Sequence, residues 1–207
     1  PRAEVCALVP TLAHTPRAAG QASEAHAPPR PIRLAIVGRP NVGKSTLVNT
    51  LIGAERVLTG PEPGVTRDAI EIEWERGGRA IRLVDTAGLR RKARIYEKDE
   101  KLATSDTLRA LKLAHVAVLV LDGTLGLDKQ DLAIAELAET EGRALVVAVN
   151  KWDAVENTKE AMARVRDRLE ASFAQLKGVP VVSISAERGM GLAKLMDAVL
   201  EIHAVWN

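Results

Sequence analysis

Residues 38–45 are the part of the chain that most restricts its fold, because they read Gly-Arg-Pro-Asn-Val-Gly-Lys-Ser and match the pattern G-x-x-x-x-G-K-S. An apolar segment at 32–37 precedes them and predicts a strand, and the pattern at 44–53 predicts a helix. The glycines let the backbone wrap around an anion, and the helix points its positive end at the same place. The pattern therefore predicts a phosphate-binding loop, with an ordinary glycine-containing turn as the alternative.

Two side chains of this loop suit a nucleoside triphosphate. Lys44 offers a positive charge to the β- and γ-phosphates, and Ser45 offers a hydroxyl ligand to Mg²⁺. We expect the phosphates to contact the loop and the start of its helix, which are Gly38, Arg39, Pro40, Asn41, Val42, Gly43, Lys44, Ser45 and Thr46.

Strand and helix patterns alternate along the rest of the chain. Strands are expected at 32–37, 69–74, 80–84, 116–121, 144–149 and 179–184, and helices at 44–53, 98–114, 129–141, 158–176 and 191–205. Gly77-Gly78 predicts a hairpin between the second and third strands. This order predicts an α/β fold of the P-loop NTPase type, with a doubly wound, mostly parallel six-stranded sheet, one antiparallel strand and helices on both faces.

Composition narrows the class of protein. The sequence is 46% apolar but only 2% aromatic, so the core must be aliphatic, and a net charge of +2 argues against a dedicated nucleic-acid clamp. Its single cysteine, Cys6, excludes an intramolecular disulfide. The longest apolar run, 116–121, is far shorter than the ~20 residues that cross a bilayer, and no signal peptide is recognised. We expect a cytoplasmic, monomeric chain without a membrane contact.

The first 31 residues differ from the rest. Six prolines interrupt them, so we predict a flexible linker at 1–31, with at most a short helix at its start, and a nucleotide-binding domain at 32–207. Because the first residue is Pro1 rather than Met, we expect the sequence to be part of a longer protein.

Two further segments complete the expected phosphate site. Asp85, at the carboxyl end of the third strand, can hold Mg²⁺ through water, and the N–H of Gly88 can reach the γ-phosphate. Thr66 lies in a loop from which it can reach both Mg²⁺ and the γ-phosphate only while the triphosphate is bound, which would make this loop a switch. A simple turn and an exposed loop threonine are the alternatives. The segment that follows the third strand is expected to contact nucleotide through Asp85, Thr86, Ala87, Gly88 and Leu89.

The sequence Asn150-Lys151-Trp152-Asp153 after the fifth strand indicates which purine is bound. The Asp153 carboxylate can accept from the ring N–H and the amine of guanine, whereas adenine presents an acceptor in place of that N–H. The stem of Lys151 can lie over the base, and Trp152 is expected to pack beside the pocket. A polar turn is the alternative. We expect the base pocket to comprise Asn150, Lys151, Trp152, Asp153, Ser185 and Ala186.

These motifs, in this order, resemble those of the Der (EngA) family of ribosome-assembly GTPases. The resemblance lies in Gly38–Ser45, Pro61–Asp68 (PEPGVTRD), Asp85–Lys92 (DTAGLRRK) and Asn150–Asp153, with a similar stretch at Glu97–Leu102. It implies two tandem G domains followed by a KH-like domain. Arg-Arg-Lys after DTAGL resembles the second G domain, so residues 1–31 would be the inter-domain linker. The resemblance implies action in biogenesis of the large ribosomal subunit, with the subunit or its rRNA bound through the full-length protein.

Hydrolysis needs a group that replaces the glutamine found after D-x-x-G in many GTPases, because Leu89 cannot orient water. The resemblance implies a bound K⁺ beside the γ-phosphate, with Asn41 as its side-chain ligand; a loop-shaping role for Asn41 is the alternative. The expected catalytic residues are Lys44, Thr66, Gly88 and Asn41, and the expected metal ligands are Ser45, Thr66, Asp85 and Asn41.

Two functions remain open from the sequence. One is a GTPase switch that times ribosome assembly, and the other is a nucleotide-dependent docking module with little intrinsic hydrolysis, which Leu89 favours. Asp153 disfavours an ATP-using enzyme. The basic run Arg90, Arg91, Lys92 and Arg94 is either a solvated loop or a surface that faces rRNA or a partner.

Overall fold

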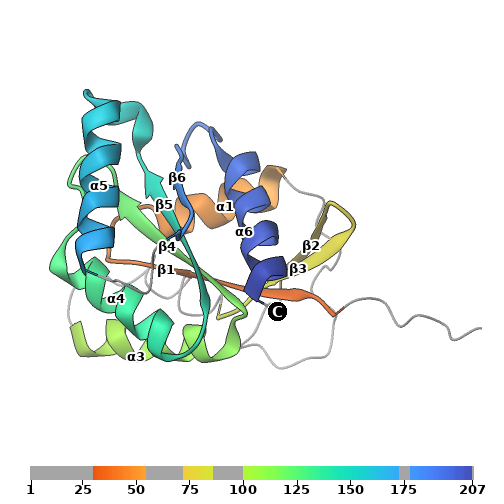
Figure 1. The fold of residues 1–207 in the computed structure, drawn as a ribbon. Coiled ribbons are helices and arrows are strands. Elements are labelled where there is room, and N and C mark those ends of the chain that lie inside the picture. Colours follow the sequence, from red (N-terminus) through yellow and green to blue (C-terminus); the bar gives the residue numbers. More distant parts are fainter. Residues whose placement is uncertain (1–29, 55–71, 86–99, 173–177, 207) are drawn as a thin grey trace, which may run out of the picture.

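The computed structural model describes residues 30–54, 72–85, 100–172 and 178–206 of the chain. It contains a six-stranded sheet in the order β2-β3-β1-β4-β5-β6, shown in Figure 1. The strands are β1 Ile32–Val37, β2 Ile72–Arg76, β3 Arg79–Leu83, β4 Val116–Asp122, β5 Ala144–Asn150 and β6 Val181–Ser183. The helices are α1 Lys44–Ala54, α3 Glu100–Leu113, α4 Lys129–Thr140, the 3₁₀ turn η1 Trp152–Ala154, α5 Thr158–Ser172 and α6 Leu192–Trp206.

The predicted fold class is confirmed. Only β2 runs antiparallel to its neighbour, and β3, β1, β4, β5 and β6 pair in parallel. The expected helix bounds agree to within about two residues wherever they fall on described residues. The last strand is shorter than the expected 179–184, because Pro180 has no N–H to donate to the ladder and β6 begins at Val181. None of the helices in the described ranges is long and apolar enough to cross a membrane.

Each face of the sheet is covered by its own helices. Helices α1 and α6 cover one face, and α3, α4 and α5 cover the other (Figure 1). Leu34 and Ile36 of β1 point to the first of these faces. Ala35 and Val37 point to the second. β4 and β5 are buried along their whole length because helices cover both of their faces. This explains why their sequences are uninterrupted apolar runs rather than alternating ones.

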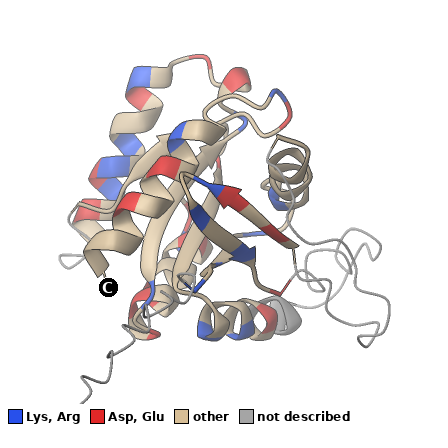
Figure 2. Ribbon diagram, turned by 90° about the vertical axis from the view of Figure 1, so that its right-hand side faces the viewer, with Lys and Arg blue, Asp and Glu red and all other residues tan. Residues whose placement is uncertain are grey.

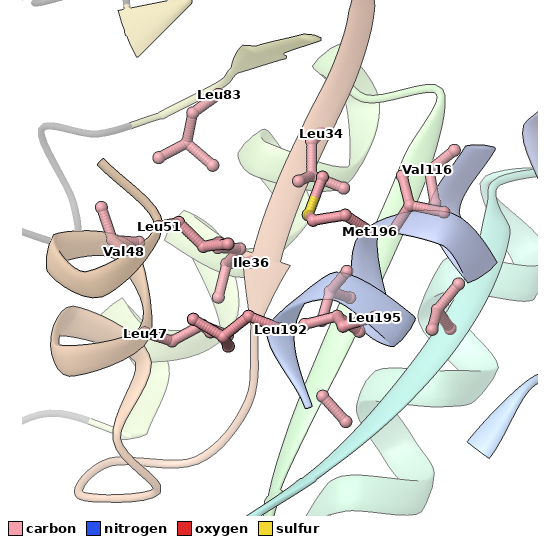
Figure 3. Packing of buried hydrophobic residues seen from close by; sticks show 14 of the residues in the cluster. Leu34, Ile36, Leu47, Val48, Leu51, Leu83, Val116, Leu192, Leu195 and Met196 are labelled. Carbon is pink, nitrogen blue, oxygen red and sulfur yellow. The ribbon is translucent and has the colours of Figure 1, made fainter. Parts of the chain in front are cut away.

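The core between β1, α1 and α6 fixes the helix that follows the Gly-rich loop. Figure 3 shows Leu51 of α1 next to Ile36 of β1, and Leu47 of α1 next to Leu192 of α6. All of these side chains are buried. Helix α1 is therefore held against the strand that precedes the loop, and the loop between them has two fixed ends.

Charged side chains avoid this interior. Figure 2 shows Lys, Arg, Asp and Glu mainly on the helices and on the hairpin formed by β2 and β3. On that hairpin Ile72 and Trp74 are buried, as the alternating pattern predicts, while Glu73 pairs across the strands with Arg82 at 2.9 Å. The chemistry-bearing loops lie elsewhere, at the carboxyl edge of the parallel strands, which is where ligands bind in such sheets.

A core substitution tests this packing. Leu195→Ala removes a fully buried side chain between α6 and the sheet, and we expect it to lower the free energy of unfolding by about 2–5 kcal/mol. Val205→Ala, on the same helix but 82% exposed, should change it by less than about 0.5 kcal/mol. Urea denaturation followed by circular dichroism measures both. Equal effects of the two substitutions would contradict the packing described.

Candidate nucleotide-binding site

The Gly-rich loop follows β1 and packs directly on two neighbouring elements. A Cβ on Gly38 would lie 2.5 Å from the carbonyl oxygen of Val120 in β4. One on Gly43 would lie 2.2 Å from Nδ2 of Asn150 at the end of β5. Both glycines also have positive φ angles, 142° and 97°. Only glycine both lacks a Cβ and adopts these φ angles without strain, so the loop packs against the sheet in one closely defined position.

Lys44 reaches back over this loop from the first turn of α1. Its Nζ donates to the carbonyl oxygen of Gly38 at 2.7 Å and also to that of Arg39. The ammonium is thus held at the mouth of the loop, in front of the amino end of α1, where a phosphate would also be attracted. Ser45 and Thr46 follow in the same helical turn.

Asp85, the predicted Mg²⁺ ligand, follows β3 with a left-handed φ of 56°. Because β3 pairs in parallel with β1, Asp85 and the Gly-rich loop lie at the same edge of the sheet. A carboxylate and a hydroxyl at one edge form an oxygen donor set of the kind that Mg²⁺ prefers. The residues present therefore fit the ion, and ligation by Ser45 and Asp85 stays a prediction.

Several predicted site residues lie outside the described residues. They are Thr66, Thr86, Ala87, Gly88 and Leu89, together with the basic run at 90–94 and residues 1–29 of the expected linker. Their predicted roles stay predictions.

Asn150 connects three parts of the site. Its side chain is buried, with the residue only 3% exposed. Nδ2 donates to the carbonyl oxygen of Val42 in the Gly-rich loop at 2.8 Å, and Oδ1 accepts from the N–H of Ala186 at 2.9 Å. One amide therefore joins the end of β5, the phosphate loop and the segment after β6.

The predicted base-reading residues follow directly. Trp152 begins η1, and its N–H donates to the carbonyl oxygen of Ile184 at 3.0 Å, while its side chain packs against the core on the α3, α4 and α5 face. The main chains of Ser185 and Met190 exchange two hydrogen bonds of 3.0 Å. The segment after β6 is thereby closed into a turn that lies against η1.

The Asp153 carboxylate is kept ionised. A hydrogen bond from the Ser185 hydroxyl is the largest cause that lowers the pKa of Asp153, and the Arg188 guanidinium, 3.2 Å away, adds to it. These effects outweigh desolvation, which acts in the opposite direction. An ionised carboxylate accepts hydrogen bonds with both oxygens, which is what recognition of guanine requires.

Sequence reasoning missed an ionic clamp on the loop. Nε of Arg39 donates to Oδ1 of Asp131 at 2.9 Å, and Nη1 donates to Asp128 at 3.1 Å. Burial raises the pKa of Asp131, although Arg39 and the N–H of Asp128 oppose the shift. Asp128 and Asp131 also form the capping box of α4. The pattern Asp-x-x-Asp before an apolar helix was the available signal.

A second missed residue is Asp122, the last residue of β4. Its side chain accepts from the N–H and the hydroxyl of Thr124 through Oδ1, and from Nζ of Lys151 through Oδ2. Burial acts to raise the pKa of Asp122, but these partners outweigh it and hold the pKa below its ordinary value. An acidic residue at the end of an otherwise apolar strand could have identified it.

Comparison with known proteins places the chain in a family. Residues 33–151 match the family described as 50S ribosome-binding GTPase. The chain belongs to this family. The part of the chain that folds around the Gly-rich loop is therefore a GTPase domain, and the enzyme class expected from the sequence is confirmed.

Curated relatives confirm the resemblance of this chain to Der. It is 54% identical over 178 residues to GTPase Der of Mesorhizobium japonicum and 54% identical over 177 residues to that of Parvibaculum lavamentivorans. Each match covers 86% of this chain but 37% of the relative. The chain therefore spans a little over a third of the length of these proteins.

Solved structures agree with the fold. Era in complex with MgGDPNP and nucleotides 1506–1542 of 16S ribosomal RNA is 26% identical, with a TM-score of 0.61 over 82% of this chain and 56% of Era. Elongation factor SelB of Methanococcus maripaludis with GppNHp has a TM-score of 0.64 at 19% identity, covering 84% of this chain and 34% of SelB. The likeness to SelB shows the shared fold alone.

The role of Asn150 as a connector can be tested without nucleotide. Asn150→Ala leaves the buried Val42 carbonyl and Ala186 N–H without their partners, and each unsatisfied group costs about 1–3 kcal/mol. Urea unfolding should show that loss of stability. Gln130→Ala, which removes an exposed amide on α4, is the matched control and should change stability by less than about 0.5 kcal/mol. A stability of Asn150→Ala equal to that of the control would refute the connector role.

Proposed function

We propose that this GTPase domain is a Mg²⁺-dependent switch that binds and hydrolyses GTP and acts, within a longer protein, in biogenesis of the large ribosomal subunit. The observation that carries the proposal is the Asn150 side chain, which joins the phosphate loop to the base-reading segments at one edge of the sheet. The family description and the relatives named GTPase Der support the ribosomal role.

The same relatives support the wider assignment. In this proposal the chain is the second G domain of a cytoplasmic Der protein, preceded by its linker. The ribosomal subunit or its rRNA is bound through the full-length protein rather than through this monomeric domain alone. Era, a neighbour in fold, was solved with a segment of 16S ribosomal RNA, which supports an RNA-linked role.

Guanine is selected by Asp153. The carboxylate accepts from the ring N–H and the exocyclic amine of guanine, and the bonds from Ser185 and Arg188 hold it ionised in one place. Adenine would set an acceptor against this carboxylate, and unpaired polar groups in a closed pocket make such discrimination large. The main chains of Ser185 and Ala186 line the same pocket in this proposal.

The phosphates are held by the loop and by Lys44. Its ammonium, which bonds loop carbonyl oxygens, lies where it can reach the β- and γ-phosphates, while main-chain N–H groups of residues 41–46 donate to them. Mg²⁺, when bound, supplies positive charge that neutralises these phosphates. Ser45 and, through water, Asp85 would hold the ion, and Thr66 would join them when the triphosphate is present.

Asn41 supports a catalytic cation. It occupies the turn of the loop with a φ of 63° and is exposed. Asparagine adopts this left-handed backbone conformation more readily than most residues, which fits the loop-shaping alternative as well. The amide oxygen is a suitable ligand for K⁺, whose charge would stabilise the phosphate as negative charge develops on it. Lys44, Thr66, Gly88 and Asn41 are the catalytic residues of this proposal.

A docking module with little intrinsic hydrolysis is the second candidate, because Leu89 replaces the side chain that orients water in many GTPases. In that case GTP binding alone would control contact with a partner or a neighbouring domain. Phosphate release under saturating GTP separates the two functions.

The cation mechanism predicts a salt-specific rate. Phosphate release from saturating GTP with Mg²⁺ should be roughly tenfold or more faster in KCl than in NaCl of equal ionic strength. Asn41→Gly accepts the positive φ without strain and should abolish the difference while GDP still binds. Equal, measurable rates in both salts would discard the cation but keep the GTPase. No turnover with GTP bound would favour the docking module.

The recognition of guanine predicts a change of preference. In Asp153→Asn the side-chain amide would donate to the extra carbonyl of xanthine, so XDP should bind better than GDP, and GDP should bind at least about 100-fold more weakly than to the wild type. Calorimetric titration with both nucleotides measures this. Asp167→Asn, an exposed site on α5, is the control. Unchanged preference in Asp153→Asn would remove this residue from the base pocket.

A further inference from the structure

Lys151 and Asp122 form a close ion pair beside the base-reading segment. Nζ of Lys151 lies 2.6 Å from Oδ2 of Asp122, whose side chain is only 5% exposed. The pairing of β4 with β5 sets Asp122 opposite Asn150, so Lys151 follows the residue that faces the carboxylate. The register of the two central strands therefore brings these side chains together.

The carboxylate of Asp122 is itself fixed. Its Oδ1 accepts from the N–H of Thr124 at 3.0 Å and from the Thr124 hydroxyl at 2.6 Å. The N–H of Gly123 donates to the carbonyl oxygen of Asn150 at 2.8 Å, which ties the turn after β4 to the end of β5. While Oδ1 is held by Thr124, Oδ2 faces the ammonium of Lys151.

Lys151 is thereby held at both ends. Its backbone has a left-handed φ of 58° between the connector Asn150 and the first residue of η1, and its ammonium is bound to Asp122. Its side chain is 42% exposed, so the apolar stem between these ends is open to a ligand. A free lysine would sample many rotamers, and an anchored one presents a fixed apolar surface.

We propose that Asp122 is a positioning residue for nucleotide binding, which anchors the Lys151 ammonium so that the lysine stem forms one preformed wall of the guanine pocket. This inference rests on the proposed function and adds a residue to it. Neither Asp122 nor Thr124 belongs to the motif residues that touch nucleotide in that proposal.

Two consequences distinguish this role from a purely structural one. The stem would contact the base and not the γ-phosphate. Loss of the anchor should therefore weaken the binding of GDP and the binding of GTP by the same factor. The KM for GTP rises, and kcat at saturation stays unchanged, because a uniform loss of binding does not alter the chemical step. A general structural defect would instead lower the free energy of unfolding and change kcat as well as KM.

The test begins with Asp122→Asn. The amide oxygen can keep both bonds from Thr124, which leaves the amide N–H₂ facing the ammonium, where two donors meet. We expect Kd for GDP and KM for GTP to rise roughly tenfold, with kcat within about twofold of the wild type. The matched control is Asp197→Asn, which breaks the exposed ion pair with Arg76 on the far hairpin and should leave all three constants unchanged.

A double-mutant cycle assigns the effect to the lysine. Lys151→Met keeps an apolar stem without an ammonium, and it should weaken the binding of GDP by a similar factor. Asp122→Asn should have no further effect in that background. Additive effects, or wild-type affinity in a folded Asp122→Asn protein, would overturn the inference.

A second route to the anchor covers the case in which Asp122→Asn does not fold. Thr124→Val alters an exposed turn residue and removes only the hydroxyl bond to Oδ1, so it should weaken GDP by a smaller factor, about twofold to fivefold. Unchanged affinity there would contradict the anchor. If the wild type itself binds neither GDP nor GTP, the proposed function fails together with the inference, whereas a failure limited to these variants leaves the GTPase intact.

Discussion

The side-chain amide of Asn150 is the interaction on which the rest of the site depends. It is buried at the end of β5 and bonds both the phosphate loop and the segment after β6. Its two partners are main-chain groups removed from water, which need hydrogen bonds. Among the described side chains, only this amide provides them. The Gly43 position shows how close this contact is, because even a methyl group there would overlap the amide nitrogen.

Two ion pairs extend this arrangement outward. Arg39 connects the Gly-rich loop to the amino end of α4 through Asp131, and Lys151 connects the segment after β5 to the end of β4 through Asp122. In each pair the carboxylate is almost fully buried and also receives main-chain hydrogen bonds. Removing one partner of such a buried ion pair is costly, and the hydrogen bonds define where the other side chain lies. Each loop of the site is therefore held in a defined orientation.

The fold, and the positions of the Gly-rich loop and of Asn150 at the ends of their strands, could be predicted from the sequence for reasons that are local. Gly38 to Ser45, the Gly77-Gly78 turn and the apolar run of β4 each carry their meaning within a few residues. The contacts of Arg39 with Asp131 and of Lys151 with Asp122 could not be predicted in this way. They join residues 92 and 29 positions apart, and they depend on strand register and on the direction of long side chains. The shortening of β6 depends similarly on which N–H groups can meet β5.

The register of β4 and β5 has a consequence for folding. Seven consecutive pairs align the two strands from Val116 with Ala144 to Asp122 with Asn150. A slip by one residue would turn every buried side chain to the opposite face, and it would also separate the last pair, from which Lys151 and the turn at Gly123 begin. The pocket is therefore completed only after the centre of the sheet has paired correctly along its full length. A ligand that binds only this register stabilises it by mass action, so nucleotide binding would report that the central strands have paired correctly.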